Sequence, residues 1–403
     1  MLLFTGKGGV GKTSVAAATA VRVAGAGGRV LLTSTDPAHS LSDVLHVTLD
    51  DEPRSVTLPG DASGSLDAQQ LDAQARLEAR WDRVRDYLAA VLAWGGVGDV
   101  AAEELVTFPG LDELFALLDL REHVMAGDHD AVIVDCAPTA ETLKLLALPD
   151  ALRWYADRVL GPGRRIARAV APLTRPLGVS GAPFPVPDDE VFDTVGEIHT
   201  QLSEVHALLT DTGRSSVRLV ATPERLALAE SSRMLTTLSL FGYGVDAVVV
   251  NRLLPDVVND PYLARWKQRH TELLAEARAT VAPVPVLTAD LLDDEPIGAA
   301  ALDHLGARLY VAHDPAAVLH DDAPVSLEVD DEIHRLRVRV PGADRDDVDL
   351  HRQGDDLLVK VAGVRRTIPL PATLRRRQVV GACVDDGVLT VRFAAIASTA
   401  TGS

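Results

Sequence analysis

Short apolar runs alternate with longer amphipathic stretches over the first three quarters of the chain. Each run is bounded by turn-forming or polar residues, and the stretch after it repeats its apolar positions every three to four residues. This alternation is typical of parallel strands that are buried on both faces and joined by helices. It predicts an α/β fold with a doubly wound, mostly parallel sheet. The expected strands are residues 2–5, 30–34, 131–135, 217–222, 247–251 and 284–287.

Two gaps between the expected strands, at roughly residues 50–129 and 143–216, are far longer than a crossover connection needs. Both contain amphipathic helical patterns, and in the first gap the apolar repeat runs from Leu66 onward. We therefore predict a helical subdomain built from about residues 52–128 and 150–215. The segment 161–187 is rich in proline and glycine, so we expect it to be mostly a solvated loop.

The hydrophobic pattern changes after residue 318. Apolar and polar residues alternate in short segments such as LRVRV and VLTVRF, which are separated by Gly-Asp-Asp and Asp-Asp-Gly turns. A period of two is typical of strands with one buried face, so the pattern predicts a small antiparallel β-sandwich. The expected organisation is a first domain at 1–318, a linker at 319–325, the sandwich at 326–396 and a frayed tail at 397–403.

Charge separates the same two regions. The 403 residues carry a formal net charge of -19, with 58 acidic and 39 basic side chains. Twelve of each lie from Ser326 onward, which leaves 46 acidic and 27 basic side chains for the first 325 residues. A field of this sign repels phosphate backbones, so we expect no nucleic acid partner.

The cysteines and the hydropathy of the sequence indicate in which cellular compartment the protein is expected. The two cysteines, Cys136 and Cys383, lie in different expected domains, and the sequence contains no C-x-x-C pair. A thiolate zinc site is therefore not expected, and a reducing compartment fits. No uninterrupted apolar stretch reaches the roughly 18 residues of a membrane-spanning helix. We expect a cytoplasmic protein.

The turn after the first expected strand carries the clearest chemical motif. The string GKGGVGKT follows a strand and opens a helix, and it fits the pattern G-x-x-x-x-G-K-[ST] at Gly6, Gly11, Lys12 and Thr13. In this context the glycines let backbone N–H groups face phosphates, and the helix N-terminus adds positive potential. The motif predicts a nucleotide site in which Lys12 bridges the β- and γ-phosphates and Thr13 ligates Mg²⁺.

A second lysine, Lys7, stands in the same loop of a chain that has only five lysines. The two-lysine loop resembles that of the arsenite-pump and tail-anchored-protein-targeting ATPases, and the resemblance extends over residues 1–318. In that family the first lysine reaches across a homodimer interface and stabilises charge at the partner's nucleotide. The resemblance implies this role for Lys7, whereas the alternative is a solvated loop lysine. It also implies nucleotide contacts for Gly6, Gly8, Gly9, Val10, Gly11, Lys12, Thr13 and Ser14.

Two later strings resemble the switch loops of this family. In STDPAHSLSD, the resemblance implies that Asp36 orients or deprotonates the attacking water. In AVIVDCAPTAETL, it implies that Asp135 holds the Mg²⁺ shell through water. The second string departs from the family pattern D-T-A-P-T-G-H-T-L at Cys136, Ala140 and Glu141, so we expect a less flexible second switch.

The implied base-binding residues come from three further strings. ATPERL and VVVNRL resemble family segments that bring Pro223, Glu224 and Asn251 to the adenine, at the edge where open α/β sheets bind ligands. DDEPIGAA resembles the adenine loop and adds Pro296 and Ile297. The implied cofactors are ATP and Mg²⁺, and zinc is not among them. The implied catalytic groups are Asp36, Lys7 and Lys12, and the implied metal-site residues are Thr13, Asp36 and Asp135.

The C-terminal region resembles the α-crystallin/small heat-shock protein domain over residues 326–394. The strings V-P-G, I-P-L-P and G-V-L-T-V carry this resemblance. Such domains bind partners through sheet edges and grooves and carry no catalytic group. A binding role for the sandwich is therefore expected.

Together these features predict an Mg²⁺-ATP-hydrolysing homodimeric ATPase of the tail-anchored-protein-targeting type. Its expected partner is an apolar client, and the resemblance also allows a membrane-associated receptor. One alternative is the ATPase subunit of an arsenite or antimonite pump, although soft metalloids need clustered thiolates and the two cysteines are isolated. Another is a positioning ATPase of the partitioning or division-site type, which would need a basic DNA-binding face or an amphipathic membrane helix.

Overall fold

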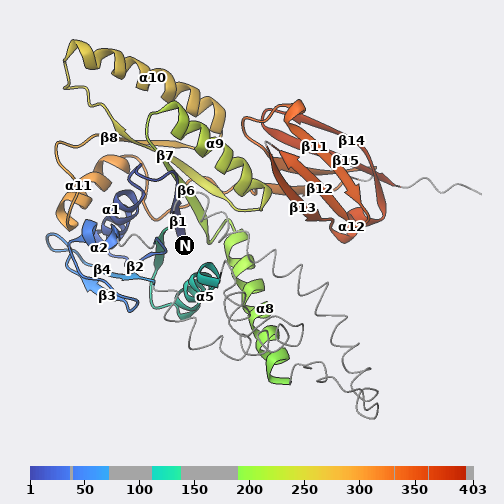
Figure 1. Ribbon diagram of the computed structural model, residues 1–403, viewed down its shortest axis with the longest axis horizontal. Coiled ribbons are helices and arrows are strands. Elements are labelled where there is room, and N and C mark those ends of the chain that lie inside the picture. The colour runs from blue at the N-terminus through green and yellow to red at the C-terminus, as the bar shows by residue number, and fades with distance from the viewer. Residues whose placement is uncertain (37–39, 72–110, 138–188, 331, 362, 396–403) are drawn as a thin grey trace, which may run out of the picture.

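The computed structural model consists of an α/β domain followed by a β-sandwich (Figure 1). The fold class predicted from the sequence is confirmed, because the central sheet is mostly parallel and the C-terminal sheets are antiparallel. The structure describes residues 1–36, 40–71, 111–137, 189–330, 332–361 and 363–395.

The α/β domain is built on an eight-stranded sheet with the order β3-β4-β2-β5-β1-β6-β7-β8. Neighbouring strands are parallel except for β3 and β4, which pair antiparallel at one edge. The central strands are almost continuously buried because both faces of the sheet are covered. The strands are β1 (Leu2–Thr5), β2 (Arg29–Ser34), β3 (Arg54–Val56), β4 (Ser65–Gln70), β5 (Ala131–Asp135), β6 (Ser216–Ala221), β7 (Val245–Leu253) and β8 (Val286–Asp290).

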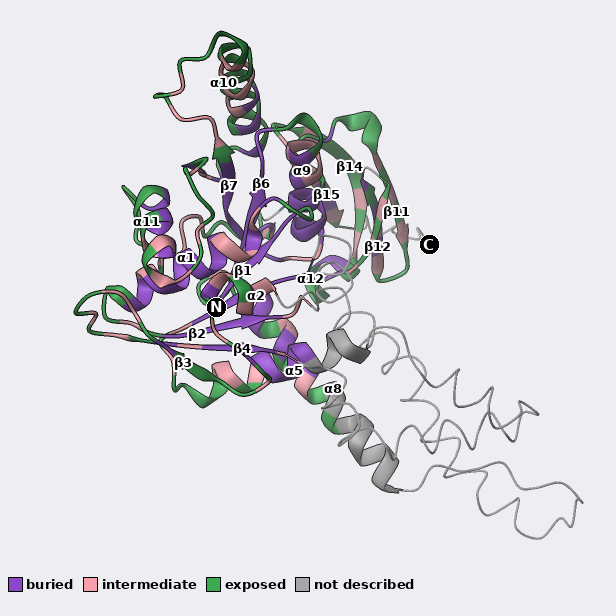
Figure 2. Ribbon diagram, turned by 60° about the vertical axis from the view of Figure 1, so that its left-hand side comes forward, coloured by how far each residue is buried: buried purple, intermediate pink, exposed green. Residues whose placement is uncertain are grey.

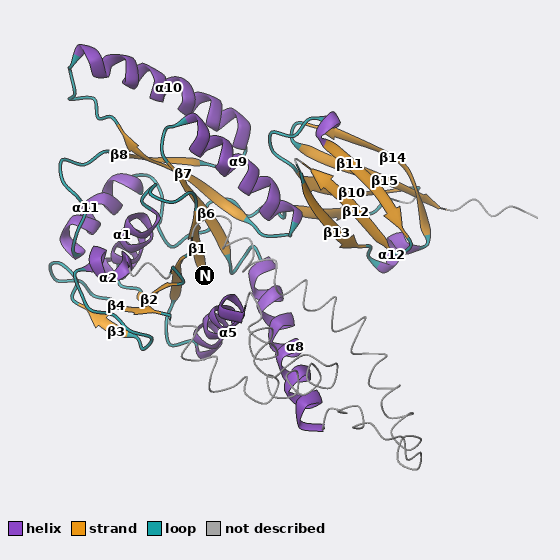
Figure 3. Ribbon diagram, viewed as in Figure 1, coloured by secondary structure: helices purple, strands orange, loops and turns teal. Residues whose placement is uncertain are grey.

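Helices pack on both faces of this sheet (Figure 3). On one face α1, α2 and α11 supply the apolar side chains, and on the other α5, α8, α9 and the end of α10 do so. The described helices of the domain are α1 (Lys12–Gly25), α2 (Ser40–Leu45), α5 (Leu111–Ala126), α8 (Asp189–Thr210), α9 (Arg225–Leu240), α10 (Pro261–Val281) and α11 (Ala299–Leu309). Of the helices that the structure describes, none combines the length and apolar character that crossing a membrane requires.

The C-terminal sandwich has a four-stranded sheet, β14-β15-β10-β9, and a three-stranded sheet, β11-β12-β13. Alternate residues of β10, β12 and β15 are buried between the two sheets, as the period-two pattern predicts. Its elements are β9 (Val325–Glu328), β10 (Ile333–Arg339), a 3-10 turn (Arg345–Asp347), β11 (Val348–Gln353), β12 (Asp356–Val361), β13 (Val364–Pro369), α12 (Ala372–Arg375), β14 (Arg377–Asp385) and β15 (Val388–Ala395).

The sandwich contacts the α/β domain at the C-terminal end of α9 (Figure 1). Leu240, the last residue of α9, is 2 % exposed and belongs to the apolar core of the sandwich. The hydroxyl of Thr236 donates a hydrogen bond to the carbonyl of Pro341 at 2.9 Å. The guanidinium of Arg366 lies 4.3 Å from the centroid of the Phe241 ring. One helix therefore belongs to the packing of both domains.

A buried ion pair fixes the segment that leaves α11. Arg218 on β6 and Asp246 on β7 are fully buried, and their side chains approach to 3.1 Å. The guanidinium of Arg218 also donates to the Tyr310 hydroxyl at 3.0 Å and to the carbonyls of Pro315 and Ala317 at 2.9 and 2.7 Å. The chain is thus held against the sheet just before the expected linker, and the linker boundaries stay a prediction.

The expected helical pattern that begins at Leu66 is wrong at its start. Ser65–Gln70 forms β4, which pairs parallel with β2, and Arg54–Val56 forms β3 beside it. The sequence hides this strand because Gln69 and Gln70 are buried through side-chain hydrogen bonds, so no apolar run marks it. The proposed helical subdomain therefore does not include the stretch from β3 to β4.

The rest of the proposed helical subdomain is described only in part. α5 and α8 are helical, as the pattern predicts, and both pack under the sheet. Residues 72–110 and 138–188, which include the expected loop at 161–187, lie outside the described residues, as does the expected tail at 397–403.

The bounds of the expected strands agree with the structure to within two residues, except at the last strand, which ends three residues later than expected. We expect that strand at 284–287, whereas β8 begins at Val286. Pro285 has no N–H to donate, and the N–H of Val284 bonds to the carbonyl of Val281 in a turn. The strand therefore starts after the proline.

Candidate functional site

A glycine loop joins β1 to α1 at the carboxyl edge of the sheet. Lys12 is the first residue of α1, and Gly11 is its N-cap, so the first N–H groups of the helix open toward the loop. Lys12 is buried, with 6 % of its surface exposed, whereas Lys7 is exposed. The described residues show no hydrogen bond or ion pair to Lys7. The two lysines therefore stand in different environments.

Close contacts explain why glycines are needed at both ends of the loop. A Cβ at Gly6 would lie 2.1 Å from the carbonyl oxygen of Val220 on β6. Gly11 has φ +92°, and a Cβ there would lie 2.5 Å from Nδ2 of Asn251. Any larger residue at either position would displace backbone or a buried amide, so the loop's shape depends on both glycines.

Residues at the C-terminal end of β7 support the phosphate loop through hydrogen bonds. The side-chain amide of Asn251 donates to the carbonyl of Val10 at 3.0 Å and accepts from the N–H of Arg252 at 2.9 Å. Arg252 in turn donates to the carbonyl of Gly9 at 3.0 Å. Because these two carbonyls accept hydrogen bonds from residues at the end of β7, the backbone of the loop is held in place. The adenine contact expected of Asn251 stays a prediction, since in this structure the amide supports the phosphate loop.

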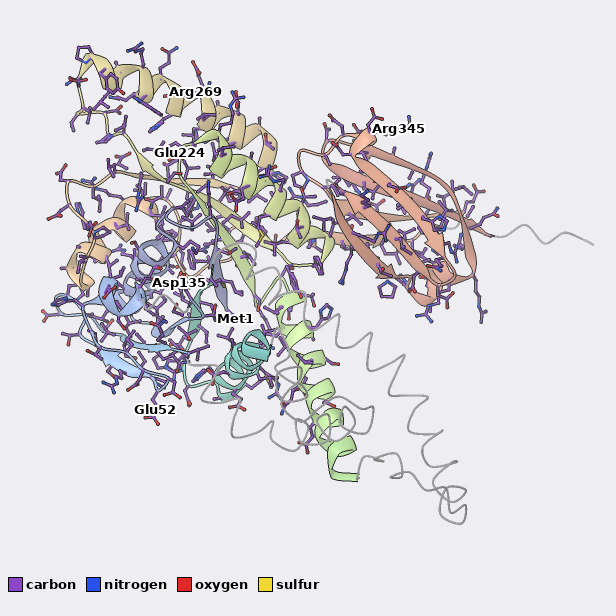
Figure 4. The ribbon with its side chains drawn as sticks, viewed as in Figure 1. Met1, Glu52, Asp135, Glu224, Arg269 and Arg345 are labelled. Carbon is purple, nitrogen blue, oxygen red and sulfur yellow. The ribbon has the colours of Figure 1, made fainter. Side chains whose placement is uncertain are left out.

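Thr13 and Asp135 form the polar centre of the site (Figure 4, where Asp135 is labelled). The Thr13 hydroxyl donates to Oδ2 of Asp135 at 2.7 Å and lies 3.3 Å from the Ser40 hydroxyl. Burial raises the pKa of Asp135 to about 7, against the opposing effects of the Thr13 hydrogen bond and the nearby Lys12 charge. Oδ1 of Asp135 is buried and has no hydrogen-bond partner among the described residues. A buried carboxylate oxygen without a partner, beside two hydroxyls, fits a Mg²⁺ site with its waters.

Asp36 follows the end of β2 on the same edge. Its N–H bonds to the Ser34 hydroxyl at 3.2 Å, and its carbonyl accepts from the Gln70 amide at 2.7 Å. Its charge adds to the raised pKa of Asp135, so the two carboxylates lie near each other. The first-switch residues 37–39 lie outside the described residues, as do Ala140 and Glu141 of the second switch.

A pocket of about 440 Å³ opens beside the phosphate loop. Its lining includes Ser14, Asn251 and Pro296, whose expected nucleotide contacts stay predictions. Ile297 is half exposed and is not among the lining residues. Pro223 is buried, whereas the exposed Glu224 is the N-cap of α9 (Figure 4). The remaining lining residues are Arg252, Asp290, Leu291, Leu292, Asp293, Asp294, Glu295 and Leu305.

Three residues of the site are not among the expected site residues, although Ser40 and Arg252 lie within the strings STDPAHSLSD and VVVNRL. Arg252 binds the loop, Ser40 contacts Thr13, and Gln70 contacts Asp36. Arg252 directly follows the VVVN string in the sequence, so its position next to Asn251 could have indicated a residue of the site. Gln70 comes from the strand that the helical pattern concealed, and nothing in its surroundings in the sequence points to the site.

A phosphate-binding loop, a buried carboxylate beside a hydroxyl, and an adjoining pocket at the carboxyl edge of a parallel sheet define a P-loop nucleotide-binding protein. Residues 1–311 match the family described as anion-transporting ATPase, and the chain belongs to this family. Residues 331–393 match the HSP20-like domain found in ArsA. The resemblance expected from the sequence is confirmed for both regions. ATPases of this family hydrolyse ATP, and the chain is an ATPase.

The chain is similar to some relatives over nearly its whole length and to others over part of it. A protein of Chlorobaculum tepidum named as an arsenical pump-driving ATPase is 35 % identical over 98 % of this chain and 95 % of its own length. Protein Rv2184c of Mycobacterium tuberculosis is 36 % identical over 97 % of this chain and 95 % of its own length. The ATPase GET3 of Chaetomium globosum is 29 % identical over 62 % of this chain and 71 % of its own length. Similarity to the first two therefore extends over nearly the whole chain.

Proposed function

We propose that the chain is an Mg²⁺-dependent ATPase that acts as a homodimer and binds and releases an apolar client, in the manner of the tail-anchored-protein-targeting ATPases. The observation that carries the proposal is the contrast between the two loop lysines. Lys12 is buried at its own site, whereas Lys7 is exposed at the same edge and, in the part of the chain that the structure describes, meets no carboxylate. An exposed cation beside a phosphate loop is suited to a nucleotide on a facing subunit.

The chemistry follows from the arrangement of the chain's own groups. The loop N–H groups and Lys12 bind the phosphates, and Thr13 with Asp135 would hold Mg²⁺. When bound, this ion offsets the charge on the β- and γ-phosphate oxygens. Asp36 orients the attacking water, and the partner's Lys7 stabilises the charge that develops on the leaving oxygen. No covalent intermediate is needed.

Exposed apolar side chains support a dimer that closes over this edge. Leu226, Val257, Leu291 and Ile297 are 71, 81, 45 and 49 % exposed. They follow the carboxyl ends of β6, β7 and β8, so the parallel sheet brings them to the edge that carries the phosphate loop. A second copy of the chain would remove them from water while bringing its Lys7 to the site.

The positions of the cysteines favour an apolar client over a metalloid. Cys136 is 1 % exposed at the end of β5, and burial raises the pKa of its thiol far above the ordinary value. Cys383 is exposed on β14 of the sandwich. A soft metalloid needs several thiolates at one place, and these two belong to different domains. The fused HSP20-like domain also agrees with a polypeptide client.

The second candidate is the ATPase subunit of an arsenical pump. It is favoured by the similarity over 98 % of the chain to the relative of that name, since the GET3 similarity covers 62 %. The two candidates differ in what stimulates hydrolysis, a client peptide or a metalloid.

Hydrolysis by the full chain should therefore be measured with an apolar transmembrane peptide, with sodium arsenite, and with neither. We expect the peptide to be retained with ATP and released with ADP, and arsenite to leave the rate unchanged. A Cys136→Ser/Cys383→Ser variant is the matched control. Arsenite stimulation in the wild type that disappears in this variant would contradict the client proposal and establish the pump candidate.

A further inference from the structure

Gln70 is a buried polar residue beside the proposed catalytic centre that the mechanism above does not use. It is the last residue of β4 and is only 3 % exposed. Its backbone N–H donates to the carbonyl of Asp50 at 2.8 Å, which fixes the strand end. Its side chain therefore projects from a hydrogen-bonded strand end, and its amide must find partners inside the protein.

The amide of Gln70 is directed at the backbone of Asp36. Nε2 donates to the Asp36 carbonyl at 2.7 Å, and Oε1 accepts no hydrogen bond from the described residues. Among the described residues the bond to Asp36 is the only hydrogen bond of this buried side chain, so its loss would leave a buried carbonyl without that partner. A bond shielded from water is also stronger than the same bond at the surface.

Other hydrogen bonds hold the backbone up to this point. The N–H of Thr35 bonds to the Asp135 carbonyl at 3.0 Å, and the N–H of Leu71 bonds to the Ser34 carbonyl at 3.1 Å. Asp36 itself has one backbone bond on each side, from its N–H to the Ser34 hydroxyl and from Gln70 to its carbonyl. The Gln70 amide thus holds the C-terminal side of Asp36, the residue proposed above to orient the attacking water.

We propose that Gln70 is a positioning residue for hydrolysis: by holding the main-chain carbonyl of Asp36, it orients the Asp36 carboxylate toward the attacking water. The inference rests on the proposed role of Asp36. Gln70 touches neither nucleotide nor metal in this account, so its loss should affect the chemical step and leave nucleotide binding in place. Small errors in the position of a catalytic group reduce rates strongly.

The neighbouring Gln69 offers a matched control. It is fully buried in the same strand, but its amide lies within hydrogen-bond distance of Thr33, Asp119 and His123. Successive residues of a strand point to opposite faces, so Gln69 is directed away from Asp36. A variant at Gln69 reports the general cost of disturbing β4.

The test is steady-state ATP hydrolysis by the full chain carrying Gln70→Met, which keeps the length of the side chain and removes the donor. We expect kcat to fall by about tenfold to a hundredfold, with KM for ATP changed by less than about threefold. Gln69→Met should leave kcat within about threefold. Gln70→Leu, which also removes the donor, is the second variant should Gln70→Met unfold, and thermal unfolding is followed for each protein. An unchanged kcat in a folded Gln70 variant would overturn the inference.

A double-variant cycle separates this inference from the proposed function. If Gln70 acts through Asp36, adding Gln70→Met to Asp36→Asn will lower kcat no further than Asp36→Asn alone. A further full-sized loss in the double variant would overturn the positioning role while leaving the catalytic role of Asp36 intact. Wild-type activity in Asp36→Asn alone would instead overturn the role of Asp36, and the inference with it.

Discussion

At the scale of single residues, Gly11 sets the geometry of the phosphate loop. It combines a left-handed backbone, φ +92°, with a close approach to the Asn251 amide that itself holds Val10. Gly11→Ala should therefore strain the backbone and push Asn251 away from the loop. We expect ATP affinity to fall at least about tenfold, which corresponds to about 1.4 kcal/mol, as measured by equilibrium binding of a fluorescent ATP analogue.

The matched control for this prediction is Gly25→Ala at the other end of α1. A Cβ at Gly25 would meet no atom within 4 Å, and alanine is favourable in a helix. This variant should keep wild-type affinity and stability. Equal affinity in the two variants would show that the loop tolerates a side chain at Gly11.

How far the site could be predicted differs from residue to residue. The loop, Asp36 and Asp135 follow from short strings in which each residue type has one chemical task. The contact between Asn251 and Val10 joins residues 241 positions apart, and no local pattern encodes it. Gln70 is harder still, because glutamine is common in many environments and its task depends on the backbone of another strand.

At the scale of elements, α9 links the nucleotide edge to the sandwich. Its N-terminus follows β6 at Glu224, and its C-terminal Leu240 is buried in the sandwich core. Figure 2 shows α9 between the strands of the α/β sheet and the sandwich. Leu240→Asp would place an unpaired carboxylate in this apolar contact, which costs several kcal/mol or expels the charge by separating the domains. We expect the connection at 319–325 to be cleaved at least about tenfold faster in limited proteolysis, because local opening governs cleavage.

An exposed apolar residue of the sandwich supplies the control for this prediction. Val380 on β14 is 48 % exposed, so Val380→Asp introduces the same charge without entering the contact. It should be cleaved at the wild-type rate, and the α/β domain should survive as a stable fragment in both cases. Equal protection of the Leu240 variant would show that the sandwich is held by other contacts.

Which elements could be predicted depends on how they become buried. β1, β5 and the sandwich strands are buried through apolar side chains, so their periodicity is visible in the sequence. β4 is buried through two glutamines whose amides bond to neighbouring elements, and hydropathy does not mark such a strand. The packing of Leu240 against the sandwich is likewise hidden, because a leucine in an amphipathic helix has the same pattern whichever partner covers it.

At the scale of the whole molecule, the account requires two chains for one active site. Lys12, Thr13, Asp36 and Asp135 come together within one chain, whereas Lys7 is exposed at the edge. Each site in the proposed dimer therefore consists of the catalytic residues of one chain and the Lys7 of the other. The exposed apolar residues of that edge would be buried in the same step.

The active site shared between two chains is tested most directly by mixing two inactive variants. Lys7→Ala retains Asp36 but lacks the lysine that its partner needs, and Asp36→Asn retains Lys7 but cannot orient water. Each alone should hydrolyse ATP at least about a hundredfold more slowly than the wild type while still binding nucleotide. In an equimolar mixture half of the dimers contain one complete site, so we predict about a quarter of the wild-type rate. A mixture that stays inactive although mixed dimers form, or a Lys7→Ala variant with the wild-type rate, would contradict the shared site.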